Sequence, residues 1–212
     1  MKKIIALLIS LSVLLSFTAC GGRPRQEDTP KEPQVQLVRG SYNEDKTVFT
    51  NESMGITVNV PQDWYIFSDN DIAEWFLDGV TGDEYSAWTQ EDFAQQITIP
   101  DMAMQDLFTG ANINLQYENL DVSANGLDID EEYYAKLSQK QLNGLGFDYE
   151  YSDLNDVQLN GQDYKWFSAT GSNDDLTFTQ YFIMRRVDNY MVVFVTTSYE
   201  DHDVQFFFDM FR

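Results

Sequence analysis

The sequence predicts an α+β domain in which a mainly antiparallel sheet is covered by helices on both faces. The dipeptide Asn160-Gly161 joins two extended stretches, which is typical of a two-residue β-hairpin. Residues 191–197 are almost all apolar or β-branched, as expected for a central strand with both faces covered. Helical periodicity occurs both before and after the strands, so helices should lie on both sides of the sheet.

The first elements are expected after Lys46. Residues 56–60 alternate apolar and polar side chains, which predicts a half-buried strand. A turn at 61–63 leads into an extended segment at 64–67. Ser68, followed three residues later by Asp71, then predicts a helix start. The apolar residues of that helix share one face: Ile72, Trp75 and Phe76.

Two glycines between residues 79 and 82 are expected to end this helix. A second short helix is predicted over 91–97, with Thr89 as its N-cap. A hairpin-like pair of strands should follow over 102–107 and 111–117, because the second stretch alternates apolar and polar residues.

The middle helix is predicted from the capping pair Asp128 and Glu131 and from apolar residues at helical spacing. Beyond the Asn160-Gly161 hairpin, residues 176–187 form a predicted strand that a turn at 188–189 joins to the central strand. A last helix is predicted to lie on the sheet because four apolar residues occur at i, i+3, i+4 and i+7: Val204, Phe207, Phe208 and Phe211.

The N-terminus has the pattern of a cleaved bacterial leader. Lys2 and Lys3 precede an apolar run from 4 to 17 that is too short for a permanent membrane span. The small residues before Cys20 resemble the lipobox of bacterial lipoproteins, although Phe17 stands where leucine is usual. We therefore expect a signal peptide over 1–19, lipid such as palmitate on Cys20, and a location on the outer face of the cytoplasmic membrane.

The next segment is predicted to be a flexible tether. Residues 20–41 contain three prolines and several glutamines but almost no apolar periodicity. Residues 42–212 are then expected to form a single domain, since about 170 residues suit one core.

Charge narrows the classes of partner. The 13 basic and 35 acidic residues give a net charge of −22, and loss of Lys2 and Lys3 with the leader makes it −24. Nucleic acid is not expected as a partner because the polyanion would be repelled. Cys20 is the single cysteine, so neither a disulfide nor thiol catalysis is expected in the domain.

Candidate chemistry is sparse. His202 is the single histidine, between two aspartates, and is interpreted as an exposed or capping residue rather than a catalytic base. Calcium could use the acidic clusters at two predicted helix starts: Asp69, Asn70, Asp71 and Glu74; and Asp128, Asp130, Glu131 and Glu132. Acidic residues are also favoured at these positions by the helix dipole alone, and neither cluster fits an EF-hand loop.

Two aromatic residues are candidates for a contact surface. Tyr85 and Trp88 lie in a segment, residues 79–90, that is rich in Gly, Asp and Thr and has the composition of a loop. We expect both side chains to be exposed there, while the other tryptophans are expected to be in the core.

The order of these elements resembles a known fold family. The run 51–55, a strand, and then Pro61-Gln62-Asp63-Trp64 resemble the opening of small Gram-positive lipoproteins with a PsbP-like domain. The resemblance covers about residues 42–212 and implies an antiparallel sheet sandwiched by helices. Most lipoproteins of that family have no assigned role, so the resemblance implies no functional residue.

Together these patterns favour a non-enzymatic, lipid-anchored accessory or binding module, whose partner is an envelope protein or a cationic ligand. No cofactor is expected. Two alternatives stay open: a small extracytoplasmic hydrolase that uses carboxylates, which requires an Asp or Glu with a raised pKa inside a pocket, and a calcium-binding surface protein.

Overall fold

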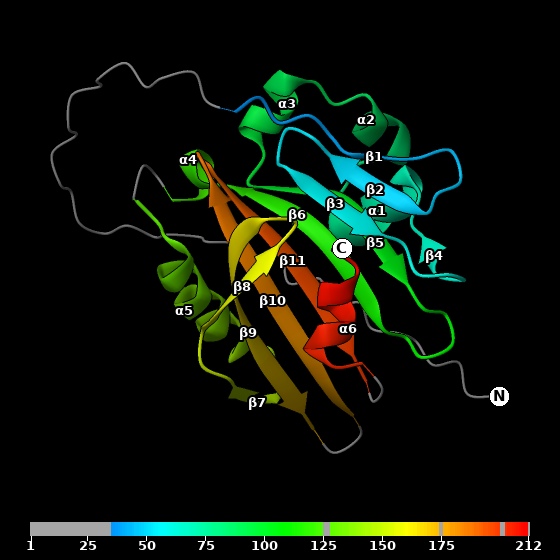
Figure 1. Cartoon of the computed structure of the whole chain (residues 1–212). Coiled ribbons are helices and arrows are strands. Elements are labelled where there is room, and N and C mark those ends of the chain that lie inside the picture. The colour runs from blue at the N-terminus through cyan, green and yellow to red at the C-terminus, as the bar shows by residue number, and fades with distance from the viewer. Residues whose placement is uncertain (1–34, 125–127, 174–175, 200–201, 212) are drawn as a thin grey trace, which may run out of the picture.

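A computed structural model describes residues 35–124, 128–173, 176–199 and 202–211 (Figure 1). Its middle layer is an antiparallel sheet of eight strands in the order β4-β5-β6-β11-β10-β9-β7, with β8 pairing with β9 beside β7. The strands are β4 (Tyr65–Ile66), β5 (Thr98–Gln105), β6 (Asn112–Asn119), β7 (Asp148–Tyr151), β8 (Asn155–Leu159), β9 (Gln162–Ser172), β10 (Thr177–Val187) and β11 (Tyr190–Ser198).

Smaller elements cover the two faces of this sheet. One face carries a three-stranded sheet and helix α6, and the other carries α4 and α5, while α1, α2 and α3 gather near the β4–β5 edge (Figure 1). The small sheet consists of β1 (Ser41–Tyr42), β2 (Val48–Asn51) and β3 (Ile56–Asn59). The helices are α1 (Asp69–Phe76), α2 (Gly82–Ser86), α3 (Gln90–Gln95), α4 (Leu120–Ser123), α5 (Glu131–Leu142) and α6 (Val204–Asp209). The predicted class, α+β with a mainly antiparallel sheet and helices on both faces, is confirmed.

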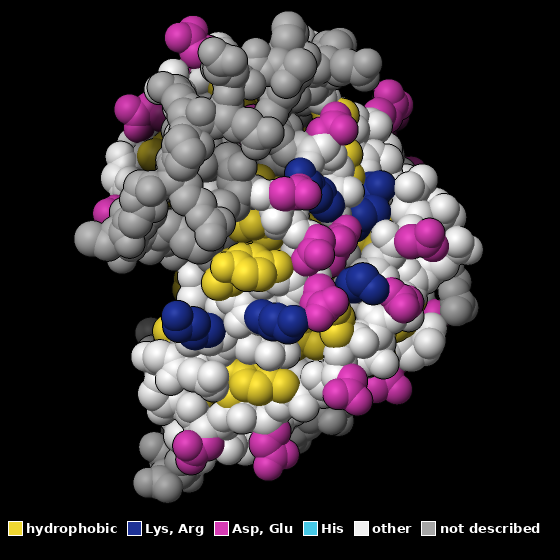
Figure 2. Space-filling view, turned by 90° about the vertical axis from the view of Figure 1, so that its left-hand side faces the viewer, with side chains coloured by type: hydrophobic (Ala, Val, Ile, Leu, Met, Phe, Trp, Pro, Cys, Tyr) yellow, Lys and Arg dark blue, Asp and Glu magenta, His cyan; other side chains and the backbone are white. Residues whose placement is uncertain are grey.

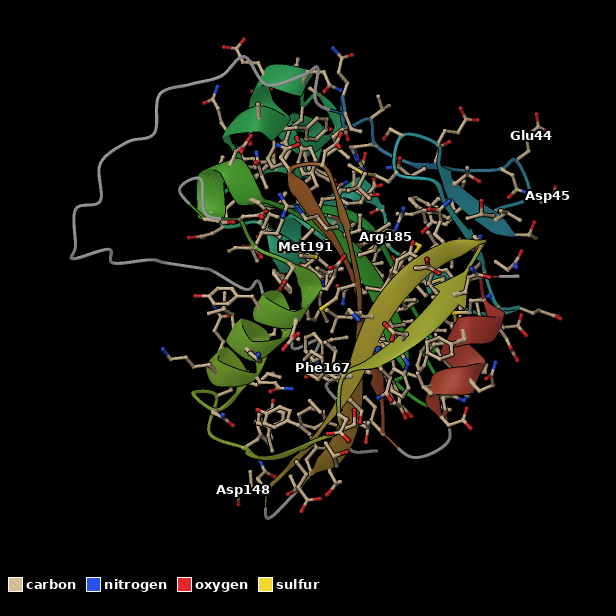
Figure 3. All side chains as sticks on the ribbon, turned by 60° about the vertical axis from the view of Figure 1, so that its left-hand side comes forward. Glu44, Asp45, Asp148, Phe167, Arg185 and Met191 are labelled. Carbon is tan, nitrogen blue, oxygen red and sulfur yellow. The ribbon has the colours of Figure 1, made fainter. Side chains whose placement is uncertain are left out.

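Alternation along the central strands sorts side chains into two cores. Val192 and Phe194 of β11 point towards the small sheet and α6, where Phe194 meets Phe211 edge to face at 4.8 Å between ring centroids. Met191 and Phe167 point the other way and lie between the sheet and α5 (Figure 3). Every residue of β11 is buried, which confirms the prediction that this nearly continuous apolar stretch is a central strand covered on both faces.

Local signals in the sequence produce several element boundaries. Asn160 and Gly161 both have positive φ, 51° and 73°, as a type I′ hairpin turn requires. The side chains of Ser68 and Asp71 cap the first turn of α1 reciprocally. Thr89 caps α3 in the same way.

The segment 79–90 differs from its prediction as a loop. Gly82 does not end a helix but is the first residue of α2, whose N-cap is Thr81. At Gly82 the backbone of α2 approaches α1 so closely that a Cβ would lie 2.7 Å from the Cα of Asn70. Glycine is therefore present for helix packing.

Two further expectations are corrected. The strand predicted over 102–107 begins earlier, because β5 starts at Thr98 and contains Pro100. Pro100 lies next to a bulge, on a stretch that β4 does not reach, where a missing N–H is tolerated. Trp75 was expected in the core, but its side chain is 47% exposed. Ile72 and Ala73 are the buried residues of α1, and Trp75 lies outside that buried face.

Candidate functional site

The chain enters the domain through a packed segment, residues 35–40, that the sequence analysis placed in the tether. Leu37 is only 1% exposed, and its carbonyl accepts a hydrogen bond from the side chain of Gln90 on α3. The backbone N–H of Val35 donates to Asp188 at 3.0 Å. Residues 35–41 therefore belong to the folded domain, and the predicted tether is too long at its C-terminal end.

A cleft of about 680 Å³ opens between this entry segment, the small sheet and the N-terminal ends of α1 and α3. Its wall is a mixture of aromatic, polar and charged side chains. Its lining includes Arg39, Tyr42, Asp69, Trp88 and Asp101.

Arg39 crosses the cleft and is held on three sides. Its guanidinium lies 2.5 Å from Asp69, 3.8 Å from Asp101 and 4.0 Å from the ring centroid of Tyr85. Burial lowers the pKa of Arg39, but the hydrogen bond and charge of Asp69 outweigh it, so the net pKa is raised. The cation is thus sequestered by two carboxylates and an aromatic face.

Asp101 is the most buried carboxylate of the cleft. Its side chain accepts hydrogen bonds from the backbone N–H of Gly40 at 3.0 Å, from Asn51 at 2.9 Å and from the hydroxyl of Tyr117 at 2.7 Å. Burial raises the pKa of Asp101, while these donors and the charge of Arg39 act in the opposite direction. The carboxylate ties the entry segment, β2 and β6 to β5.

Gly40 is needed for this arrangement. A Cβ at this position would meet the ring of Phe49 and would lie 2.8 Å from the carbonyl oxygen of Thr50. Only glycine brings the backbone N–H of the entry segment close enough to donate to Asp101.

Two buried polar groups of the cleft-lining residues have no hydrogen-bond partner within the described part of the chain: the hydroxyl of Tyr42 and Nε of Arg39. Burial also raises the pKa of Tyr42, so this hydroxyl is a neutral donor at ordinary pH. The cleft can therefore offer a hydroxyl beside an aromatic wall and a fixed charge pair.

The predicted contact surface at Tyr85 and Trp88 is corrected. Tyr85 is fully buried, and its hydroxyl donates to the carbonyl of Pro100. Trp88 is half-buried, because its ring packs between Tyr85 and Phe93 at centroid distances of 5.1 and 5.9 Å. The segment is helical rather than open, so Tyr85 supports the floor under Arg39 and Trp88 contributes part of the cleft wall.

A second buried carboxyl lies on the opposite face of the sheet. Glu118 of β6 is 1% exposed and accepts a hydrogen bond from Tyr134 of α5 at 2.8 Å. Burial raises the pKa of Glu118 to about 7. Because Tyr134 closes over it, we assign this group to helix packing.

The first group of calcium candidates is used by the protein itself. Asp69 is bonded to Arg39 and to Ser86, while Asp71 turns back to the N-cap Ser68. Glu74 is exposed one turn further along α1. The fold therefore does not bring these carboxylates together.

The second group is also divided among other contacts. Asp128 pairs with Arg186, and Asp130 caps α5 by accepting from the backbone N–H of Tyr133 at 2.7 Å. Glu131 accepts from the backbone N–H of Arg186, and Glu132 pairs with Lys136. In the described part of the chain, no group of three or more His, Cys, Asp or Glu residues is arranged to hold a metal ion.

The remaining predicted residues have simple placements. The ring of His202 stacks on Phe206 at 3.9 Å between centroids, just before α6. Cys20 and the predicted signal peptide lie outside the described residues. Among the helices of those residues, none is both long enough and apolar enough to cross a bilayer.

The sequence contained one unused signal for this site. Asp101 interrupts an otherwise apolar run from Ile99 to Met104, and a lone carboxylate in a buried strand needs partners. The partners themselves come from distant positions, so sequence reasoning would have found Asp101 but not the cleft.

Charge divides the domain into two halves. Residues 47–130, here called the anionic segment, contain 16 Asp and Glu but neither Lys nor Arg. They form β2 to β6 and α1 to α4, including the β4–β6 half of the main sheet. On the side of the molecule that carries α5, Lys and Arg side chains lie among Asp and Glu (Figure 2). Arg39 and Arg186 come from outside the segment and pair with Asp69, Asp101 and Asp128. Over its other carboxylates, a cationic partner meets a field with a large excess of negative charge.

Comparison with known proteins gives a fold-level likeness. No protein-family model matches the chain, and no curated protein matches its sequence. The structure is similar to the solution structure of cyanobacterial PsbP (CyanoP) from Synechocystis sp. PCC 6803, with a TM-score of 0.44 and 12% sequence identity over 92% of this chain and 95% of that chain. That protein belongs to the fold family that the sequence resembles, and the similarity concerns the fold alone.

Proposed function

We propose that this protein is a non-enzymatic binding module, anchored by lipid on Cys20 to the outer face of the bacterial cytoplasmic membrane. The leader pattern and the cysteine support the anchor. The composition of residues 20–34 predicts a flexible chain, which would span about 20 Å. Such a tether keeps the domain near the membrane while letting it turn towards a neighbouring protein.

The partner is an envelope protein with a basic surface. The observation that carries this proposal is the anionic segment. It makes up about half of the domain and contains many acidic residues but no Lys or Arg. A surface with a large excess of negative charge speeds association with a basic partner and disfavours acidic ones. The strength and rate of binding should therefore fall as salt is added.

The proposal is tested by neutralising exposed carboxylates in two matched sets. The lobe set lies in the anionic segment: Glu74→Gln, Asp78→Asn, Asp83→Asn and Glu91→Gln. The control set lies on β7 to β9 and their loops: Asp148→Asn, Glu150→Gln, Asp153→Asn and Asp163→Asn. Both sets remove four exposed negative charges, so they change the net charge equally.

Cross-linking in intact cells followed by mass spectrometry first identifies the protein that is recovered in near-stoichiometric yield. Its association rate with the purified chain is then measured at low and high salt. We expect the lobe set to slow association about tenfold at low salt and the control set to have a much smaller effect. Equal effects of the two sets, or binding that is independent of salt, would refute recognition by the anionic segment.

A carboxylate-dependent hydrolase is the second candidate, because Asp101 lines the cleft and its pKa is raised by burial. Against this role, both of its oxygens accept hydrogen bonds from the protein's own backbone and side chains. Chromogenic esters and glycosides provide the test. Turnover that disappears in Asp101→Asn, while the melting temperature is retained, would favour the hydrolase.

A further inference from the structure

Four large apolar side chains are exposed on one edge of the domain. Leu107 and Phe108 are 66% and 88% exposed in the loop between β5 and β6, and Tyr65 of β4 and Trp75 of α1 are 43% and 47% exposed. We call these four residues the edge patch. Exposed aromatic residues of this size in one region are typical of a contact surface.

The fold brings the four residues to the same edge. Tyr65 pairs with Gln105, two residues before Leu107, so β4 begins beside the loop. Phe67 links Tyr65 to Trp75, with ring centroids at 5.4 and 6.4 Å. Figure 1 shows α1, β4 and the loop between β5 and β6 along the same edge of the domain, so the patch joins these three elements.

The loop holds its apolar pair in a defined conformation. The side chain of Asp106 accepts from the backbone N–H of Phe108 at 2.7 Å and from the hydroxyl of Thr109 at 2.8 Å. The backbone of Gly110 donates to the carbonyl of Asp106 at 2.9 Å. Binding through such a loop costs little conformational entropy, because the turn is already formed.

The charges around the edge patch are mostly negative. Asp71 accepts a hydrogen bond from the hydroxyl of Tyr65, Asp106 forms the base of the loop, and Glu74 precedes Trp75. Lys46 shares a shallow depression with Tyr65, together with Asp45 and Asp63. Among the described residues, acidic groups thus outnumber Lys46 around the patch.

These charges favour one kind of binding partner for the edge patch. An anionic lipid surface is disfavoured, because each carboxylate brought to it is repelled. A second copy of this chain is disfavoured as well, since the same acidic border would face itself. We propose that the edge patch docks into an apolar pocket bordered by Lys and Arg on an envelope protein. This inference rests on the proposed function and names the surface that makes the contact.

The test places a photo-cross-linking amino acid, p-benzoylphenylalanine, at Phe108 of the full lipid-anchored chain in intact cells. A matched chain carries it at Tyr133, which is 45% exposed on α5 and distant from the patch in sequence and fold. We expect a protein adduct at 108 that is absent at 133. Mass spectrometry should map it to a partner segment that combines apolar residues with Lys or Arg.

Affinity for that mapped partner provides the second measurement. Phe108→Ser should weaken binding about thirtyfold, the effect of truncating a central aromatic residue. Tyr133→Ser should change it less than twofold. Unchanged circular dichroism and melting temperature in Phe108→Ser are expected because the side chain is exposed.

Several outcomes would overturn the proposal. Adducts at 108 with lipid or with a second copy would do so, as would identical adducts at 108 and 133. Sedimentation of the unlipidated chain with phosphatidylglycerol vesicles that depends on Phe108 would assign the patch to the membrane.

If the lobe set slows association but Phe108→Ser does not weaken binding, the proposed function stands and the edge patch is wrong. If neither set of variants affects any partner, both proposals fail.

Discussion

Replacing Glu118 with Gln should stabilise the domain in a pH-dependent way. The carboxyl of Glu118 is 1% exposed, and its pKa rises from an ordinary value of 4.5 to about 7 on burial. The folded state therefore holds a proton that the unfolded chain releases between these values. Stability falls as the pH rises through that window, because the folded state binds more protons there.

The magnitude follows from the size of the shift. The rise in pKa from 4.5 to about 7 corresponds to a loss of stability of about 3 kcal/mol. This loss is absent below pH 4.5 and complete above pH 7. Glutamine has nearly the same shape and can still accept the hydrogen bond of Tyr134, but it never ionises. The stability advantage of Glu118→Gln over the wild type should thus grow by about 3 kcal/mol between pH 4.5 and pH 8.

Urea denaturation of both chains at a series of pH values, each made without the leader and lipid, measures this difference. The other acidic residues are common to both chains, so their effects on stability cancel in the comparison. A difference that stays constant within about 1 kcal/mol across the series would refute the reasoning, since Glu118 would then titrate alike in the folded and unfolded chains.

Three further predictions concern the cleft and the metal candidates. Asp101→Ala should lower stability by about 3 kcal/mol in the same denaturation assay, because it leaves buried donors without an acceptor. Asp69→Ala should cost about 1 kcal/mol or less, because the Asp69 side chain is 37% exposed. A larger loss of stability in Asp69→Ala than in Asp101→Ala would contradict these roles. Tyr85→Phe should lower stability by about 1 kcal/mol, because it removes the hydrogen bond to the carbonyl of Pro100, and should leave the affinity for the partner unchanged. Weaker binding without a drop in stability would instead show that Tyr85 contacts the partner. Calcium at millimolar concentration should not raise the melting temperature above its value in magnesium, because the carboxylates of Asp69 and Asp128 already pair with arginines. A rise in melting temperature that is specific to calcium would contradict this prediction.

The sequence predicted most of the elements because their signals are local. Ser68 and Thr89 begin helices by hydrogen bonds to residues three positions away, and Asn160-Gly161 turns the chain through its own backbone angles. The continuous apolar strand near residue 194 likewise predicted burial on both faces. Such features need no knowledge of the remaining chain.

The candidate site was less predictable because its contacts join distant positions. Composition placed Arg39 in the tether, since prolines and polar residues surround it. Its actual environment depends on Asp69 and Asp101, which come from α1 and β5. Tyr85 and Trp88 were misplaced although α2 has a local start signal, the capping box of Thr81 and Glu84. Gly82 lets this helix pack closely against α1, and that tertiary contact could not be predicted from the sequence.

By itself, the sequence determined the fold class, the caps and turns, and the uneven charge, because each depends on residue type and short spacing. Only the tertiary structure decided which polar groups meet. The partners of Asp101 are Gly40, Asn51 and Tyr117, which lie 61, 50 and 16 residues from it in the chain. The tertiary structure also decided that Tyr85 is buried while Phe108 is exposed, since burial depends on what packs over a side chain and not on its hydrophobicity.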